Sequence, residues 1–104
     1  MVEVTKHDEE VIEKVENAVC KHFGVSQQDI LNKDKRRDIS VARSMCWMIL
    51  HCEYKFSFRK IANAYYRNIR TVSLLIAKMK YQVSKQKMFG NSHSEILFEL
   101  KNGR

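Results

Sequence analysis

The spacing of apolar residues predicts that the chain begins with an amphipathic helix. Thr5 followed by Asp8 is a variant of the capping box that begins helices, and Gly24 is typical of a helix end. Between them, the residues of one face recur at the three- and four-residue steps of an α-helix. These residues are Val11, Val15, Ala18, Val19, His22 and Phe23. We therefore expect a first helix between Thr5 and Gly24.

A short second helix and a longer third helix are predicted on either side of a polar segment. Ser26 with Asp29 predicts the beginning of the second helix. Residues 33–38 contain no apolar side chain and are interpreted as an exposed basic loop. Asp38 is then the expected cap of a third helix. The apolar positions of that helix are numerous enough to bury much of its circumference: Ile39, Val41, Ala42, Met45, Trp47, Met48, Ile49 and Cys52.

Two further helices are predicted around a break at residues 66–68. Ser57 is the expected cap of a fourth helix, Phe58 to Tyr65, and Asn68 is the expected cap of a fifth that extends to about Lys87. The fifth helix carries a regular inward stripe: Ile69, Val72, Ile76, Met79 and Val83. Its other faces are polar or basic, so it is amphipathic with a cationic exterior.

A short terminal helix over residues 94–100 is predicted after a Gly-Asn-Ser turn at 90–92. The 104 residues include no proline and three glycines, too few turn residues for a sandwich or barrel of many short strands. This length suits one hydrophobic core. We expect an all-α fold, a compact bundle of about five to six helices in one domain, residues 1–104. A helix-turn-helix is expected at about 57–87, with 88–104 as a C-terminal extension.

The charges are unevenly distributed along the chain, whose formal net charge is +7. Residues 1–32 hold three basic and seven acidic side chains, whereas residues 33–87 hold fourteen basic and three acidic ones. The excess of positive charge in residues 33–87 predicts that this segment binds a polyanion and releases the counterions of that polyanion. No apolar run approaches the roughly 20 residues of a membrane span, and the acidic beginning is unlike a secretory signal. We therefore expect a cytoplasmic, nucleoid-associated protein.

The fourth and fifth helices, with the break between them, have the pattern of a helix-turn-helix. An α-helix fits the major groove of B-DNA, and residues near its beginning reach base edges. Arg70, Thr71 and Ser73 are the predicted groove-facing residues, with Leu74 as a candidate contact to a thymine methyl group. Lys78 on the same helix is a further candidate DNA contact.

Several strings of residues, taken with the basic loop, carry a resemblance to a known family: Asp29-Ile30-Leu31, Ser40-Val41-Ala42-Arg43, Ile61-Ala62-Asn63-Ala64-Tyr65 and Arg67-Asn68-Ile69-Arg70-Thr71-Val72. From Val15 to about Lys87 the chain resembles the C-terminal DNA-binding domain of the bacterial replication initiator DnaA. The resemblance implies a TrpR/DnaA C-terminal-like bundle. It also implies a double-stranded DNA partner, and a role in replication initiation or its regulation.

The resemblance also implies which residues contact DNA. An arginine of the loop, Arg36 or Arg37, is expected to enter the minor groove, while Asn68 through Thr71 read the major groove. The full set of expected DNA contacts combines these positions with the neighbouring cations and polar residues: Lys33, Lys35, Arg36, Arg37, Arg43, Arg67, Asn68, Arg70, Thr71, Ser73 and Lys78. Arg43 has an alternative interpretation, in which it pairs with Asp38 or with the region of Glu53.

The chain departs from the family pattern at the residues that read bases. The family carries Asp-His-Thr-Thr-Val where this chain has Asn68-Ile69-Arg70-Thr71-Val72, and the glycine-rich turn before Arg67 is reduced to Tyr66. Ser44-Met45-Cys46 replaces the proline and the Arg-Gln pair that usually follow Val-Ala-Arg. Each lost direct contact corresponds to about 1–3 kcal/mol of base discrimination. We therefore expect altered recognition of the usual DnaA box.

Two other functions stay open on the sequence. One is a protein-interaction module whose basic helical face docks an acidic partner, such as a replication or regulatory protein, and the other is RNA binding.

Cys46, His51 and Cys52 lack the paired spacing of a zinc site, so no metal or cofactor is expected. No arrangement of nucleophile, base or paired carboxylates predicts an enzyme. Trp47 is expected in the core, and Tyr65, Tyr66 and Tyr81 are candidates for stacking on bases.

Overall fold

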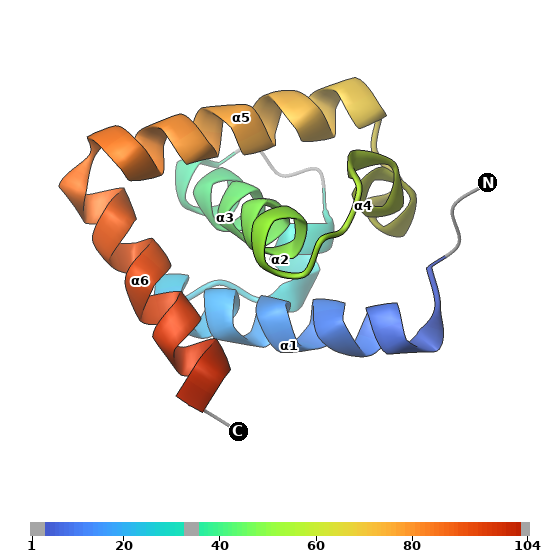
Figure 1. The fold of residues 1–104 in the computed structure, drawn as a ribbon, viewed down its shortest axis with the longest axis horizontal. Coiled ribbons are helices and arrows are strands. Elements are labelled where there is room, and N and C mark those ends of the chain that lie inside the picture. The colour runs from blue at the N-terminus through green and yellow to red at the C-terminus, as the bar shows by residue number, and fades with distance from the viewer. Residues whose placement is uncertain (1–3, 33–35, 103–104) are drawn as a thin grey trace.

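The structure is a computed structural model that describes residues 4–32 and 36–102. Within these two ranges the chain forms helices and no strand, so the all-α prediction is confirmed (Figure 1). The helices, in chain order, are α1 (Lys6–Phe23), α2 (Gln27–Leu31), α3 (Arg37–Glu53), α4 (Phe58–Tyr65), α5 (Ile69–Lys85) and α6 (Lys87–Asn102). They pack into a bundle of 37 × 30 × 23 Å.

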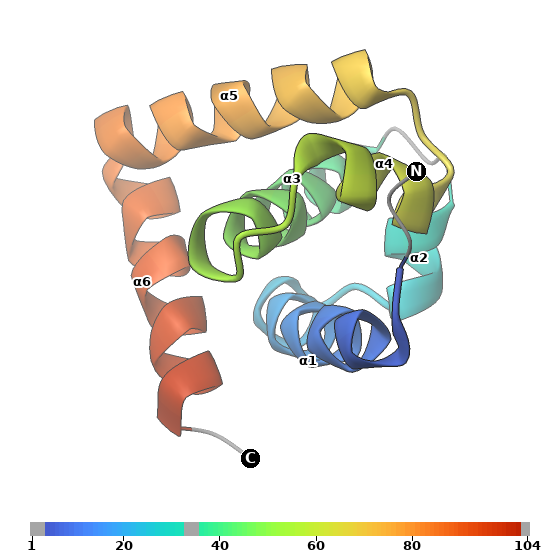
Figure 2. The same ribbon diagram turned by 45° about the vertical axis from the view of Figure 1, so that its right-hand side comes forward.

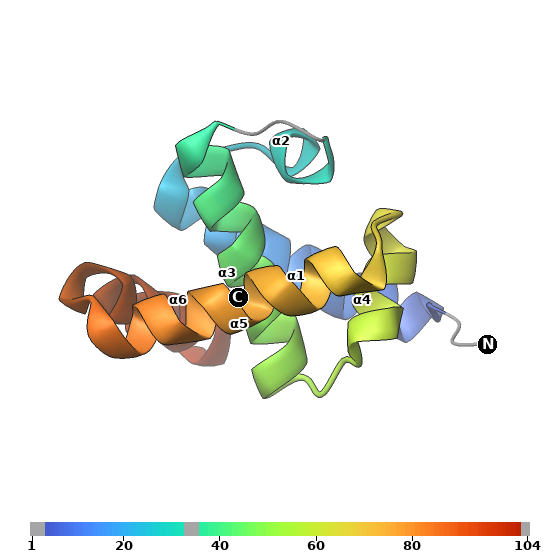
Figure 3. The ribbon, with the colours of Figure 1, turned by 90° about the horizontal axis from the view of Figure 1, so that it is seen from above.

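Helix α3 lies at the centre of the bundle. Figure 1 looks nearly along it, with α5 above and α1 below, while α6 joins these outer helices on the left. Seen from above, α5 crosses over α3 (Figure 3). Every residue from 42 to 50 is buried, and Met45, Trp47 and Ile49 have no exposed surface. The predictions that α3 is buried on much of its circumference and that Trp47 is a core residue are confirmed.

The beginnings of α1 and α2 follow the local sequence. The Thr5 hydroxyl accepts from the Asp8 amide at 3.1 Å, and the Asp8 carboxylate accepts from the Thr5 amide at 3.0 Å. Ser26 and Asp29 form the same reciprocal capping box at the beginning of α2. Gly24 ends α1 with φ +71°, a left-handed conformation in which glycine has no Cβ to clash. The predicted capping residues of both helices are therefore confirmed.

The prediction that Asp38 caps α3 is wrong. The helix begins two residues earlier, because the Ser40 amide already donates to the Arg36 carbonyl at 2.8 Å. Arg36 is the capping residue, and its side chain does not cap a backbone amide. Asp38 lies in the first turn, where its carboxylate accepts from the Ile39 amide at 2.9 Å and suits the positive end of the helix dipole.

The C-terminal helix is longer than the sequence predicts. Residues 90–92, interpreted as a turn, lie inside α6, and α5 and α6 are separated by Gln86 alone. A Cβ atom on Gly90 would lie 3.0 Å from the carbonyl oxygen of Val83, so glycine permits the tight corner between the two helices. The glycine therefore marks a close approach of two backbones rather than a chain reversal.

Candidate nucleic-acid interface

The turn between α4 and α5 is short and defined by backbone geometry. The Ser57 hydroxyl accepts from the Lys60 amide at 3.0 Å and begins α4. Tyr66 then adopts a left-handed conformation, φ 56° and ψ 46°, and the Arg67 amide donates to the Ala62 carbonyl at 2.9 Å. The Asn68 side chain accepts from the Arg70 amide at 2.8 Å and begins α5. The predicted caps, Ser57 and Asn68, are both confirmed.

Helix α5 has a buried face and an exposed face. Val72, Ile76 and Met79 of the predicted inward stripe are buried, and Val83 is half-buried. Ile69 is 39 % exposed, so the stripe does not extend to the first residue of the helix. The exposed face carries cationic, polar and large apolar side chains: Asn68, Arg70, Thr71, Leu74, Lys78 and Tyr81.

Two of these exposed residues are related by one helical turn. Arg70 and Leu74 are four residues apart, so they lie on the same side of α5 near its beginning. Leu74 is 63 % exposed, so most of its side chain is accessible. Ser73 is half-buried, and its hydroxyl donates to the Arg70 carbonyl at 3.1 Å. Arg70, Thr71 and Leu74 are therefore more accessible than Ser73.

The end of the basic loop and the outer side of α5 lie beside the same hollow. Lys33 and Lys35 fall outside the described residues, whereas Arg36 and Arg37 are exposed at the beginning of α3. Arg37 from α3 and Lys78 from α5 line a hollow of about 280 Å³. The other lining residues are polar and apolar in equal number: Ser40, Ser44 and Gln82, with Val41, Leu75 and Met79. Two cations from separate helices thus line one surface depression.

Arg43 and Arg67, both predicted DNA contacts, direct their guanidinium groups toward the C-terminal end of α2. Arg43 is 6 % exposed. Its Nε donates to the Ile30 carbonyl at 2.9 Å, and its Nη2 donates to the carbonyls of Asp29 and Asn32. The interpretation of Arg43 as a DNA contact is therefore corrected, because its charged head is turned into the protein. Neither Asp38 nor Glu53 receives these hydrogen bonds.

Arg67 is half-buried and has backbone partners of its own. Its Nη1 donates to the Tyr65 carbonyl at 3.1 Å. Its Nη2 donates to the Asn32 carbonyl at 2.9 Å and to the Leu31 carbonyl at 3.3 Å. The sequence contains no local signal for this arrangement, because Arg67 is 35 and 36 residues away from its partners at the end of α2.

A buried polar cluster lies on the inner side of α4 and corrects the role expected for Tyr65. This tyrosine is 2 % exposed, so it is not available for stacking on bases. Its hydroxyl donates to the buried Glu16 carboxylate and lies 3.6 Å from the Cys46 sulfur. Burial raises the pKa of Glu16 above its usual value, and burial raises the pKa of the Cys20 thiol to about 11. Tyr66 and Tyr81, in contrast, are exposed.

The sequence contained a signal for this cluster. Glu16 follows Ile12 by four residues and precedes Val19 and Cys20 by three and four, so helical periodicity places it on the inner side of α1. A carboxyl group at such a position needs a hydrogen-bond donor, and Tyr65 supplies it.

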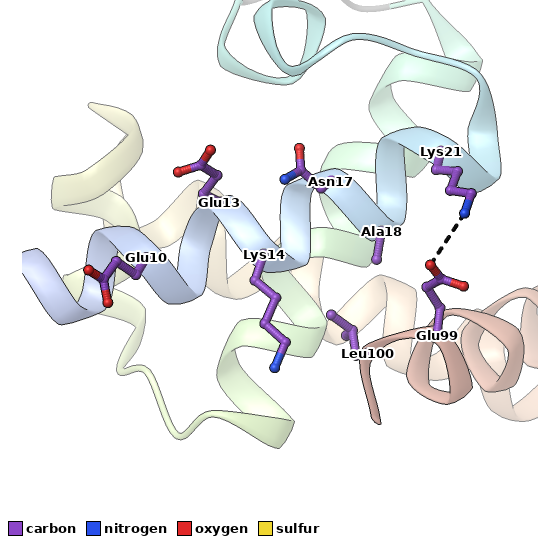
Figure 4. A pocket seen from close by; sticks show the side chains of 8 residues that line it. All are labelled: Glu10, Glu13, Lys14, Asn17, Ala18, Lys21, Glu99 and Leu100. Atoms are coloured by element: carbon purple, nitrogen blue, oxygen red, sulfur yellow. Dashed lines mark hydrogen bonds and ion pairs between the residues drawn. The ribbon is translucent and has the colours of Figure 1, made fainter. Parts of the chain in front are cut away.

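The surface between α1 and α6 has a different character. Figure 4 shows a pocket of about 430 Å³ there, in which Glu10, Glu13 and Glu99 accompany Lys14 and Lys21. Lys21 already pairs with Glu99 at 3.4 Å. In Figure 1 this surface belongs to the side of the bundle that faces away from α5. Because carboxylates repel a polyanion, this pocket is a poor candidate for nucleic acid.

The described part of the chain has neither a metal-binding cluster nor a helix suited to cross a membrane. Residues 4–32 and 36–102 contain no cluster of three or more potential metal ligands. Over the same ranges, none of the helices combines the length and the apolar character that crossing a membrane requires. The three cysteines are free thiols, of which Cys20 and Cys46 are buried and Cys52 is partly exposed.

Comparison with known proteins places the same region in one family. A family model described as the bacterial dnaA protein helix-turn-helix matches residues 12–79. The chromosomal replication initiator protein DnaA of Pseudothermotoga lettingae is 32% identical over 92 residues, or 88% of this chain. The protein of the same name from Mycoplasma pneumoniae is 28% identical over 71 residues, or 68% of this chain. The chain spans 21% and 16% of the lengths of these relatives. Because the family model covers more than half of its residues, this chain belongs to the bacterial DnaA helix-turn-helix family.

Proposed function

We propose that the chain binds duplex DNA, with the beginning of α5 in the major groove. The observation that carries this proposal is the exposed first half of α5, where Arg70, Thr71 and Leu74 lie directly after a capped helix start. Base edges in the major groove are read by side chains in this position of a helix-turn-helix. Membership of the DnaA family supports the same conclusion, since the relatives are named as chromosomal replication initiators.

The hollow between α3 and α5 is our proposed contact with the DNA backbone. Arg37 and Lys78 line it, and two cations on one surface attract phosphate groups. Arg36, exposed beside Arg37, is the candidate for the minor groove together with Arg37 itself. In this proposal the chain serves replication initiation or its regulation, and the departures at Asn68, Ile69 and Arg70 give it a target different from the usual DnaA box.

The first test is selection of bound fragments from a pool of random duplexes, repeated at two salt concentrations. We expect enrichment of a common motif and a steep loss of affinity with salt. Arg37→Glu and Lys78→Glu should weaken binding to every duplex, whereas Lys14→Glu on the opposite side of the bundle is the matched control and should have little effect. Absence of duplex binding at low salt would overturn the proposal.

A second test addresses individual bases. Arginine pairs best with the O6 and N7 atoms of guanine, and an exposed leucine contacts the thymine methyl group. We therefore expect Arg70→Ala to relax the preference for one guanine, and Leu74→Ala to relax the preference for one thymine. Replacing that guanine by 7-deazaguanine, or that thymine by uracil, should weaken the wild-type protein but not the corresponding variant. Equal sensitivity of wild type and variant would contradict the assignment.

Exposed apolar residues on the same helix favour one alternative, a protein-interaction surface. Ile69 is 39 % exposed, Leu74 is 63 % exposed and Tyr81 is 62 % exposed, and all three belong to the cationic helix α5. Such a mixed surface suits an acidic partner, for example a replication or regulatory protein. A stoichiometric complex with an acidic protein, formed by a chain that does not shift duplex DNA, would select this alternative.

A further inference from the structure

The C-terminal end of α2 receives two guanidinium groups. The last carbonyl groups of a helix have no partner within the helix, and they carry the negative end of its dipole. Here the carbonyls of Asp29 and Ile30 accept from Arg43, and the carbonyl of Leu31 accepts from Arg67. The Asn32 carbonyl accepts from both arginines. Four consecutive carbonyls are thus satisfied by two side chains, an arrangement that we call the arginine bracket.

The arginine bracket joins three parts of the fold that are separate in sequence. Arg43 belongs to α3, and Arg67 belongs to the turn between α4 and α5. Figure 2 shows α2 below this turn on the right side of the molecule, with the beginning of α5 above. Asn32 directly precedes the basic loop in sequence, and Arg67 directly precedes Asn68, the cap of α5. The bracket therefore connects Asn32, which precedes the basic loop, to Arg67, which precedes the cap of α5.

The chemistry of the bracket requires arginine. A guanidinium group has five N–H donors in a rigid planar fork, so Arg67 contacts Tyr65 at the end of α4 and Asn32 at the end of α2 at the same time. A lysine ammonium group is a single point charge on a flexible stem and does not reproduce this geometry. A phosphate contact, in contrast, tolerates lysine because the charge is retained.

We propose that Arg67 is a positioning residue for DNA recognition, which it serves by fixing the start of α5 against α2 while Arg43 holds α2 against α3. This inference rests on the proposed DNA binding. It gives Arg43 and Arg67 the role of positioning helices instead of the role of contacting phosphate groups. Sequence discrimination depends on the position of Arg70 in the groove, whereas general attraction to DNA depends on charge. Loss of the bracket should therefore reduce discrimination more than general affinity.

The test compares two duplexes, the one selected from the random pool by the wild-type protein and a shuffled duplex of equal length and composition. We expect both Arg67→Ala and Arg67→Lys to weaken binding to the selected duplex about tenfold and to change binding to the shuffled duplex less than about twofold. Arg59→Lys is the matched control. It makes the same exchange at an exposed position of α4 that belongs neither to the bracket nor to the proposed interface, and it should retain affinity for both duplexes.

Two outcomes would overturn the proposal while leaving duplex binding itself intact. If Arg67→Lys binds both duplexes with wild-type affinity, Arg67 is a phosphate contact. If the Arg67 variants lose affinity equally for both duplexes, the loss comes from a phosphate contact or from a general loss of folded protein. The measurements are made at a temperature where circular dichroism shows each variant to be folded. Failure of the wild-type protein to bind any duplex would count against the proposed function instead.

A readout without DNA tests the bracket directly. The Val72 amide donates to the Asn68 carbonyl at 3.1 Å in the first turn of α5. We expect its hydrogen exchange to be about tenfold faster in Arg67→Lys, with the amide of Trp47 in the buried helix α3 unchanged. Unchanged exchange at Val72 would show that Arg67 does not hold the start of α5, whatever the protein binds.

Discussion

Tyr66 carries the backbone strain of the turn between α4 and α5. Its φ of 56° lies in the left-handed region, which costs a residue with a Cβ atom about 1–2 kcal/mol. The side chain is 87 % exposed, so packing does not offset this cost. We expect Tyr66→Gly to be about 1 kcal/mol more stable than Tyr66→Ala, because only glycine removes the strain. Urea denaturation of the two variants measures the difference, and equal midpoints with equal slopes would contradict it.

Glu16 makes the stability of the fold depend on pH. Burial raises the pKa of its carboxyl group in the folded state above the value in the unfolded chain. The folded state therefore binds this proton more readily, and the resulting stability is complete below the unfolded pKa and is lost as the pH rises through the folded pKa. Glu16→Gln keeps an oxygen that accepts from the Tyr65 hydroxyl but removes the titration.

The corresponding prediction concerns the difference between wild type and Glu16→Gln. We expect Glu16→Gln to gain stability relative to the wild type as the pH rises from about 4 to about 8. Asp8 titrates in both proteins with a lowered pKa, caused mainly by the backbone hydrogen bond from Thr5, so its contribution cancels in the difference. Urea unfolding at several pH values gives this difference. A difference that stays constant with pH would show that Glu16 does not titrate as described.

At the scale of the element, the cap of α4 is important because α4 is the short first helix of the α4–α5 pair. The Ser57 hydroxyl accepts from the Lys60 amide, one of the donors that have no partner inside the helix. We expect Ser57→Ala to lower the free energy of unfolding by about 1 kcal/mol. Ser57→Asp is the matched control, since aspartate also caps helices and should keep most of the stability. Chemical denaturation distinguishes the two, and indistinguishable variants would argue against capping.

Helix α5 combines two functions on its two faces. Val72, Ile76 and Met79 pack inward, and this packing holds the outer residues Arg70 and Leu74 in a fixed direction. Side chains on a packed helix are positioned more accurately than side chains on a loop. The part of the candidate interface that depends on α5 is therefore expected to be rigid in the free protein.

At the scale of the whole molecule, α6 completes the core. Phe89, Ile96 and Leu100 are buried, and Lys21 and His22 of α1 lie near Glu99 and Glu95 of α6 at 3.4 and 3.6 Å. We expect Phe89→Ala to lower the free energy of unfolding by about 3 kcal/mol, in one transition seen equally by circular dichroism and Trp47 fluorescence.

The same helix supplies the control for this prediction. Phe98 is 68 % exposed, so Phe98→Ala should change stability by less than about 0.5 kcal/mol. Neither substitution lies on the outer face of α5, and both folded variants should bind duplex DNA as the wild type does. Separate transitions for the two probes in Phe89→Ala would show that α6 folds independently of the rest of the bundle.

The sequence alone determined the helices, most of their ends and the two faces of α5. Capping by Thr5, Ser26, Ser57 and Asn68, and the periodic burial of α5, depend on residues at most four positions apart, and such signals can be read locally. The first half of α5 as the candidate interface follows from the same signals, because the inward stripe defines the outer face.

The roles of the interior polar groups and of several cations depend on contacts between segments that are distant in sequence. Arg43 and Arg67 hold α2 across 11 to 36 residues of sequence, and Tyr65 donates to Glu16 across 49. Gly90 permits a helix corner that its sequence context presents as a turn. In each case the partner comes from another part of the fold. The sequence shows that a residue is a cation, but the packing of the helices determines whether this cation contacts a phosphate or a backbone carbonyl.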